Sequence, residues 1–259
     1  MEDISVGFIG GGRVTGIILA GWKRGGQMPG RVVVSETDPA ALAVLKERFP
    51  EIEAAGDDPT VPASADIVVL ALHPPAIGAV LQAITPALRG GAMLVSLAPK
   101  WRIGAIAAVL GAARPVVRMI PNAPSVVGMG YNPFACSPGL RPEECERFVR
   151  LFAPLGETVE TDEEKLEAYA LLTAMGPTYF WFQWYELLDL ADSFGLSPEE
   201  ARTGLFAMVA GALRTMTDAG LSPAQVMDLV PVHPIAGGEE EIRRLYRENL
   251  RDLYQKLAG

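Results

Sequence analysis

Histidine and cysteine are scarce in this chain, which has two of each among 259 residues. Cys136 and Cys145 form no CxxC pair, and together with His73 and His233 they cannot assemble a zinc or haem site from Cys and His alone. The sequence therefore predicts no bound metal and two reduced cysteines in a reducing compartment. The acidic start Met-Glu-Asp lacks the basic region of a secretory signal, so a cytoplasmic location is expected.

Positive charge is also in deficit, because 22 Lys and Arg oppose 31 Asp and Glu for a formal charge of −9. Surfaces that bind nucleic acid or anionic lipid need a dense field of basic residues, so both partners are excluded. Long unbroken apolar runs are missing too. Prolines interrupt the uncharged stretches 67–88, 119–140 and 168–185, so none of them reads as a membrane-spanning helix of about 20 residues.

What the sequence does contain is a regular alternation of short β-branched runs and helical patterns. The predicted strands are 4–9, 31–35, 66–72, 92–97 and 115–119, and the predicted helices between them include 40–49, 76–88 and 103–110. This alternation predicts an α/β fold with a doubly wound, parallel Rossmann sheet. After 157–161 only long helical patterns follow. We therefore predict a dinucleotide-binding domain at 1–161 and an all-helical domain for substrate binding and dimerisation at 162–259.

Three consecutive glycines follow the first predicted strand. Gly10 permits the tight turn, and Gly12 lets the backbone approach a pyrophosphate that faces the amides of the next helix. The third position of this fingerprint is Thr15, where Gly or Ala is usual, so the helix is expected slightly further from the strand. The pattern predicts a dinucleotide site, and the alternative is a plain glycine turn.

Three segments together carry a more specific resemblance. They are VGFIGGGRV at 6–14, RMIPNAPSVVG at 118–128 and EEKLEAYALLTAMGPTYFWF at 163–182. In this order they resemble the pyrroline-5-carboxylate reductase family, which makes proline from a cyclic imine with NADPH or NADH. The resemblance runs along nearly the whole chain. It implies a Rossmann domain followed by a helical domain through which two copies form an intertwined homodimer.

The resemblance also implies which turn residues contact the cofactor. They are Gly10, Gly12, Arg13, Val14, Leu72, His73, Pro74, Ala98 and Asn122, with His73 in the place of a family lysine. Glu36 ends the second predicted strand, where an acidic side chain can bind the ribose hydroxyls of NAD and repel the 2'-phosphate of NADP. Asp58 falls near the same ribose. The cofactor is therefore NAD or NADP with NADH favoured, unless both acids are ordinary turn carboxylates.

The match is weakest where the substrate is expected. At 230–238 the family's Ser-Pro-Gly-Gly-Thr-Thr loop is replaced by a segment without Ser or Thr. Hydride addition to a C=N bond requires a protonated nitrogen, and His233, the only imidazole of the second domain, is the candidate acid. Its alternative role is to cap the last helix. Thr173, in the place of a family serine, is either a donor to substrate or bonded to a helix carbonyl.

The function that follows is NAD(P)H-dependent reduction of a small cyclic imine, by default 1-pyrroline-5-carboxylate to L-proline. One alternative is a related imine or carbonyl reductase with a less anionic substrate, because three acids at 239–241 make the last helix a poor site for a carboxylate. Another is a non-catalytic dinucleotide-binding homologue. The aromatic residues at 180–184 are expected in the substrate pocket, the core or the dimer interface.

Overall fold

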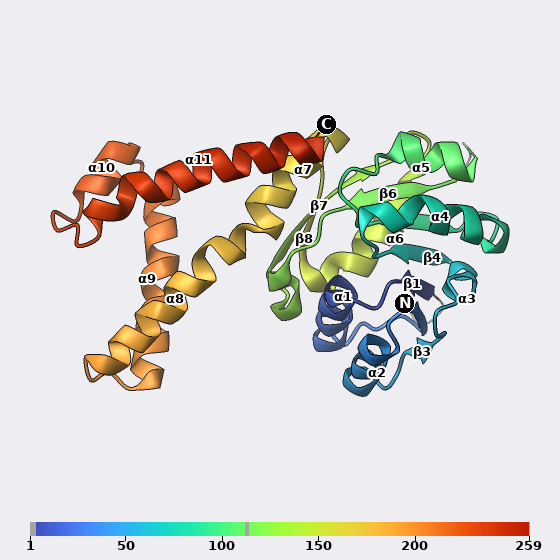
Figure 1. The fold of residues 1–259 in the computed structure, drawn as a ribbon, viewed down its shortest axis with the longest axis horizontal. Coiled ribbons are helices and arrows are strands. Elements are labelled where there is room, and N and C mark those ends of the chain that lie inside the picture. Colours follow the sequence, from blue (N-terminus) through green and yellow to red (C-terminus); the bar gives the residue numbers. More distant parts are fainter. Residues whose placement is uncertain (1–3, 112–113, 259) are drawn as a thin grey trace. The chain divides into compact units, whose positions relative to one another are not determined.

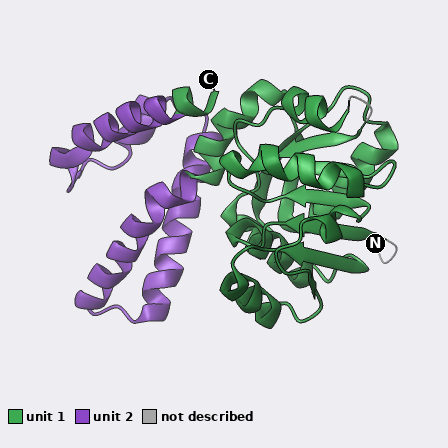
Figure 2. Cartoon of the chain, turned by 45° about the vertical axis from the view of Figure 1, so that its right-hand side comes forward, with its two compact units in different colours: residues 1–175, 254–259 green, residues 176–253 purple. Residues whose placement is uncertain are grey.

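The computed structural model describes residues 4–111 and 114–258, which form two compact units (Figures 1 and 2). Unit 1 comprises residues up to Met175 together with the last turn of the chain from Tyr254, and unit 2 comprises Gly176–Leu253. Within the described ranges, every helix is too short or too polar to cross a bilayer.

The described part of unit 1 contains one sheet of eight strands in the order β3-β2-β1-β4-β5-β6-β7-β8. The strands are β1 Ser5–Ile9, β2 Arg31–Ser35, β3 Glu53–Ala54, β4 Ile67–Leu70, β5 Met93–Ser96, β6 Val116–Met119, β7 Gly130–Cys136 and β8 Gly156–Glu160. All neighbours are parallel except β6 and β7. That exception arises because a parallel crossover needs a dozen or more residues, and the 120–129 connection is shorter. The predicted doubly wound Rossmann fold is confirmed.

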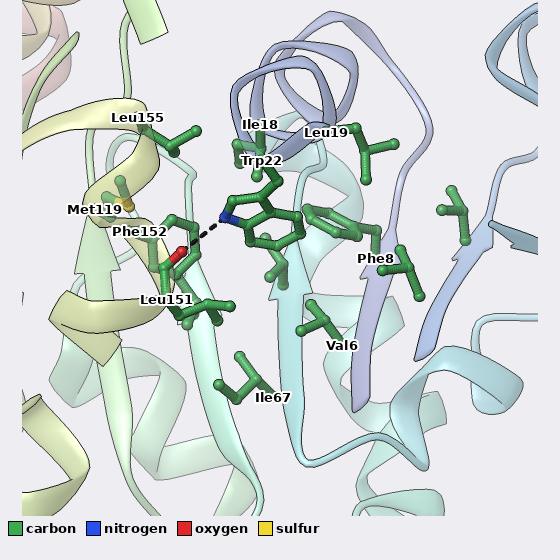
Figure 3. Packing of buried hydrophobic residues seen from close by; sticks show 14 of the residues in the cluster. Val6, Phe8, Ile18, Leu19, Trp22, Ile67, Met119, Leu151, Phe152 and Leu155 are labelled. Carbon is green, nitrogen blue, oxygen red and sulfur yellow. Dashed lines mark hydrogen bonds between the residues drawn. The ribbon is translucent and has the colours of Figure 1, made fainter. Parts of the chain in front are cut away.

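Helices cover both faces of this sheet, because the central strands are apolar on both sides. On one face, α1 Arg13–Arg24, α2 Pro39–Arg48 and α6 Pro142–Phe152 pack against alternate strand residues. On the other, α4 Pro74–Ile84 and α5 Ile103–Leu110 pack beside the short α3 Thr60–Ala63. Trp22 of α1 lies at the centre of the first core, in tilted ring contacts with Phe8 and Phe152, and its indole nitrogen donates to the carbonyl of Leu151 at 2.8 Å (Figure 3).

The regular elements of unit 2 are helices joined by short loops. It contains α8 Gly176–Ser193, α9 Pro198–Asp218, α10 Pro223–Asp228 and most of α11 Ala236–Ala258. Ser197 and Ser222 each cap a helix that begins with proline, as the two Gly-Leu-Ser-Pro turns predict, and Glu200 and Gln225 complete the capping boxes.

Two features of unit 1 differ from the sequence prediction. The compact units divide after Met175 rather than after residue 161, because residues 162–175, including α7 Leu166–Tyr169, pack on the sheet. Glu163 and Glu167 in this segment bind buried Arg118 of β6. Helix α6, the short helix α3 and the two-residue strand β3 were not predicted. Two separate domains remain a proposal, with the boundary moved to Met175.

Candidate functional site

A cleft of about 780 Å³ opens at the carboxyl ends of β1, β4 and β5 in unit 1. This is the position at which doubly wound sheets bind dinucleotides. The lining residues come from the glycine turn, from the turns after β4 and β5, and from α2: Gly11, Gly12, Arg13, Val14, Gly16, Ala40, Ala41, Val44, Leu45, Arg48, Ala71, Leu72, His73, Pro74, Leu97 and Pro99.

The glycine turn has the backbone that a pyrophosphate site requires. Gly10 has a φ of +105°, and a Cβ there would lie 2.4 Å from the carbonyl oxygen of Ala71, so only glycine fits without strain. A Cβ on Gly12 would meet nothing within 4 Å, which leaves the cleft open to a ligand at this point. Gly12 is the N-cap of α1 without a side-chain cap, and no acid lies in the first turn. The turn therefore offers helix amides to an anion.

Thr15 replaces the usual third glycine without leaving a polar group unpaired. Its side chain is fully buried, and its hydroxyl donates to the carbonyl of Gly10 at 2.6 Å. The hydroxyl therefore fastens α1 to the turn that precedes it, and the third glycine of the fingerprint is dispensable here.

Glu36 lies beside the glycine turn. Its carboxylate accepts a hydrogen bond from the Gly11 amide at 2.8 Å and another from the Asp38 amide at 3.0 Å. Burial raises the pKa of Glu36, but these amides together with Thr37 outweigh that effect and hold the pKa below its ordinary value. The side chain is thus an oriented anion at the end of β2.

Gly10 and Glu36 lie next to the lining residue Gly11 but do not themselves line the cleft, and three more predicted cofactor residues do not line it either. Ala98 is buried between the lining residues Leu97 and Pro99. Asp58 is exposed and accepts hydrogen bonds from the amide and hydroxyl of Thr60, at the start of α3. Asn122 is buried and donates to the carbonyl of Thr173 at 3.2 Å. Cofactor contacts for these three residues stay a prediction.

Sequence reasoning missed the contribution of α2. Its residues from Ala40 to Arg48 form one wall of the cleft, and Arg48 adds a second guanidinium to that of Arg13. The helix pattern at 40–49 was visible in the sequence, but the packing of α2 beside α1 is a tertiary contact. No local motif indicates it.

A buried ion-pair network stabilises the turn after β5, and sequence reasoning missed it as well. Arg118 is fully buried, and its two terminal nitrogens donate to Glu163 at 2.9 Å and to Glu167 at 2.6 Å. The same carboxylates accept from the Ile103 amide at 2.7 Å and from the Lys100 amide at 3.4 Å. Residues 97–103, which include lining residues of the cleft, are therefore tied to Arg118.

The two predicted catalytic residues both have internal partners. Thr173 donates to the carbonyl of Tyr169 at 2.8 Å, which is the bond to a helix carbonyl that the sequence left open. His233 is exposed in the loop between α10 and α11, and its Nε2 lies 2.7 Å from the carbonyl oxygen of Val230. Because a carbonyl only accepts, Nε2 carries the hydrogen in this arrangement. The catalytic roles of both residues stay predictions.

Comparison with known proteins agrees with this geometry. Residues 5–100 match the family model described as NADP oxidoreductase, coenzyme F420-dependent. The pyrroline-5-carboxylate reductase of Pseudomonas aeruginosa is 28% identical over 87% of this chain and 83% of its own. The Escherichia coli enzyme of that name is 27% identical over 87% and 84%. A solved pyrroline-5-carboxylate reductase from Coxiella burnetii has a TM-score of 0.69 at 27% identity and covers 98% and 94%.

A glycine turn over an open cleft, at the strand ends of a Rossmann sheet that is followed by helices, defines a class of dinucleotide-dependent oxidoreductases. A Plasmodium falciparum pyrroline carboxylate reductase, solved with NADP bound, shares the fold with a TM-score of 0.75 at 20% identity over 100% of this chain and 95% of that one. Within this class, the chain is similar to pyrroline-5-carboxylate reductases over most of its length.

Proposed function

We propose that the protein is an NAD(P)H-dependent reductase of a small cyclic imine, with 1-pyrroline-5-carboxylate as default substrate and L-proline as product. The observation that carries the proposal is the cleft at the strand ends with its open glycine turn. Similarity to pyrroline-5-carboxylate reductases over most of the chain supports the choice of reaction.

The residues of the cleft fit a nicotinamide dinucleotide. Gly12 and the first amides of α1 would hold the pyrophosphate, and Glu36 would accept from the adenosine ribose. The turns at Leu72–Pro74 and Leu97–Pro99 would flank the nicotinamide. When bound, the reduced cofactor supplies the hydride that the imine carbon receives.

The protein must also leave a proton on the imine nitrogen, and His233 is the proposed donor. To act as an acid from Nε2, the imidazole has to leave the carbonyl of Val230 that it now binds. Nδ1 is the alternative atom in the imidazolium form, because both ring nitrogens then carry hydrogen.

The direct test of this function is turnover by the purified full-length chain. With NADH, 1-pyrroline-5-carboxylate should give proline and NAD in equal amounts. Replacing His233 by Asn should lower kcat/KM at least about tenfold if His233 transfers the proton, whereas exposed Asp228→Asn, at the end of α10, should leave it unchanged. Unaltered kinetics in His233→Asn would reject the acid, and cofactor binding without turnover of any cyclic imine would favour the non-catalytic alternative.

We also propose a preference for NADH over NADPH, supported by the oriented carboxylate of Glu36 beside the glycine turn. A 2'-phosphate near this anion would meet like charge at short range. Asp58 carries a second carboxylate, but its bonds to Thr60 at the start of α3 give it a local structural role.

Replacing Glu36 by Ser is therefore expected to change cofactor choice. The ratio of kcat/KM for NADH to that for NADPH should fall at least about tenfold, equivalent to 1.4 kcal/mol. Asp58→Asn removes the same charge from a residue that bonds to Thr60 and not to the glycine turn, and it should leave the ratio unchanged. An equal shift in both variants would mean that net charge, and not contact with the ribose, sets the preference.

The structure weakens one argument for a less anionic substrate, namely the three acids at 239–241 at the start of α11. Each acid at 239–241 is paired with an arginine of α11: Glu239 with Arg243, Glu240 with Arg247 and Glu241 with Arg244. The repulsion of a substrate carboxylate by this turn is therefore weaker than the sequence suggests. The loss of hydroxyls at 230–238 remains the argument for a different imine.

We propose that two copies of the chain form a homodimer through unit 2. Large apolar side chains are exposed there in the single chain, including Phe182 at 68%, Phe194 at 77% and Phe206 at 73%. A water-exposed apolar surface of this kind is typical of an interface. Sedimentation equilibrium should give twice the chain mass, and a monomer at micromolar concentration would contradict the dimer. A cytoplasmic location stays a prediction.

A further inference from the structure

Two cysteines and a glutamate from three elements of unit 1 converge away from the cleft. Cys136 is the last residue of β7, Glu160 is the last residue of β8, and Cys145 lies on α6. Strands β7 and β8 are parallel, so their carboxyl ends lie at the same edge of the sheet. One Sγ from each cysteine and one carboxylate oxygen of Glu160 all lie within 4.8 Å of one another.

The spacing of the two thiols matches that of metal ligands. Their sulfur atoms are 3.9 Å apart. Two thiolates bound tetrahedrally to zinc at about 2.3 Å lie about 3.8 Å from each other. A disulfide would instead require about 2.05 Å. Strand β7 and helix α6 thus already hold the two sulfurs at the separation expected around a bound cation.

We propose that Cys136, Cys145 and Glu160 form a binding site for a thiophilic divalent cation of the zinc type. Both thiols release a proton on binding, and the ion forms bonds to two thiolate sulfurs and one carboxylate oxygen. Water completes the tetrahedral coordination. This differs from the sequence expectation of no metal, because that expectation counted only Cys and His as ligands.

The three ligands lie in a hollow large enough for a hydrated cation, and carboxylates face that hollow. The ligands line a hollow of about 550 Å³ together with apolar side chains of Leu140, Pro142 and Val149. The charged groups that face it are Glu160 from β8 and Glu146 and Arg150 from α6, and the last two form an ion pair at 3.3 Å. Glu146 is therefore a carboxylate near the site whose charge is already partly balanced.

Binding at this site should depend on pH. Burial, followed by the nearness of Cys145 and then of Glu160, raises the pKa of the Cys136 thiol well above its ordinary value, and burial also raises the pKa of Cys145. Without a cation both thiols are therefore protonated at neutral pH. A divalent cation binds the thiolate form and therefore favours loss of both thiol protons. Its affinity should increase with pH, and its uptake should release two protons.

The experiment uses the full-length chain, fully reduced and freed of metal by a chelator, with Co²⁺ as the probe. One equivalent should produce a thiolate-to-cobalt charge-transfer band and the visible bands of a tetrahedral site, and Zn²⁺ should remove both. Cys136→Ser and Cys145→Ser should each abolish the charge-transfer spectrum or shift it to that of a single thiolate. Zn²⁺ should raise the Tm of the parent chain and not of either serine variant.

A matched pair of variants on β8 tests the third ligand. Glu160→Gln should weaken Co²⁺ binding at least about tenfold, while Glu157→Gln, an exposed acid on the same strand, should bind as the parent does. Failure of the reduced parent to give the charge-transfer band would overturn the site. So would a charge-transfer spectrum that is unchanged from the parent in both serine variants, or equal affinity in Glu160→Gln and the parent.

Discussion

Arg118→Met is expected to lower the free energy of unfolding by about 3–5 kcal/mol, the usual cost of removing one partner from a buried ion pair. The arginine side chain is completely buried, and its partners Glu163 and Glu167 are 19% and 3% exposed. Without the guanidinium, one buried and one mostly buried carboxylate keep the amides of Lys100 and Ile103 as donors but lose their counter-charge. Urea unfolding at neutral pH, compared at constant m-value, measures the loss.

Two control variants separate burial from charge. Arg31→Met removes an equally close ion pair with Glu53, at 2.7 Å, but both side chains are about half exposed, so the loss should stay below about 1 kcal/mol. Combining Arg118→Met with Glu163→Gln and Glu167→Gln removes the uncompensated charges and should recover much of the stability. Equal losses in Arg31→Met and Arg118→Met would contradict the role of burial.

The same network should affect activity because it holds the turn after β5. Lys100 has a φ of +72°, and its amide is bonded to Glu167. If Arg118 positions this turn, the folded Arg118→Met variant should also show weaker dinucleotide affinity. A variant that is less stable yet binds the dinucleotide as the parent does would limit Arg118 to a structural role.

Gly10→Ala is the second change with a large expected effect. Its φ of +105° is strained for any residue with a Cβ, and the new carbon would lie 2.4 Å from the oxygen and 2.9 Å from the carbon of the Ala71 carbonyl group. Because the obstacle is backbone, β1 or β4 must shift, and a loss of at least about 2 kcal/mol of stability is expected. Thermal unfolding should show a lower Tm together with lost dinucleotide binding.

Gly12→Ala provides the matched comparison two residues away. Its Cβ would meet no atom within 4 Å and its φ is −74°, so the fold should be unaffected. The methyl group would instead occupy the space where a pyrophosphate approaches, and dinucleotide affinity should fall at least about tenfold. Fluorescence titration with NADH measures this fall. Unchanged affinity would mean that the dinucleotide does not bind over this turn.

Local pattern was sufficient to predict most of unit 1. The short β-branched runs predicted β1, β2, β4, β5 and β6 nearly to their ends but not the two-residue β3, and the 103–110 helix has the predicted bounds. The predictions succeeded because strands buried on both faces must be apolar throughout, and because a glycine turn after such a strand has few other uses. The sequence likewise placed Glu36 at the end of β2, and the side chain at this one position decides which charge lies beside the glycine turn.

Long-range contacts decided the rest. Helix α6 has a strongly amphipathic sequence that begins with proline, so its existence was readable from local pattern, but its packing against α1 and the sheet was not. Arg118 and Glu167 are far apart in the chain, so their pairing and the later division of the units could not be read from either segment alone.

By itself, the sequence determined the Rossmann topology, the glycine turn and the likeness to imine reductases, because each of these follows from patterns among residues that are close together in the chain. Only the tertiary structure decided that α2 lines the cleft, that Asp58 binds Thr60 at the start of α3, and that Cys136, Cys145 and Glu160 meet. The physical reason is that these contacts join elements brought together by burial of apolar surface. Apolar surface shows which face of an element is buried, but the sequence does not encode at any fixed spacing which other element that face will contact.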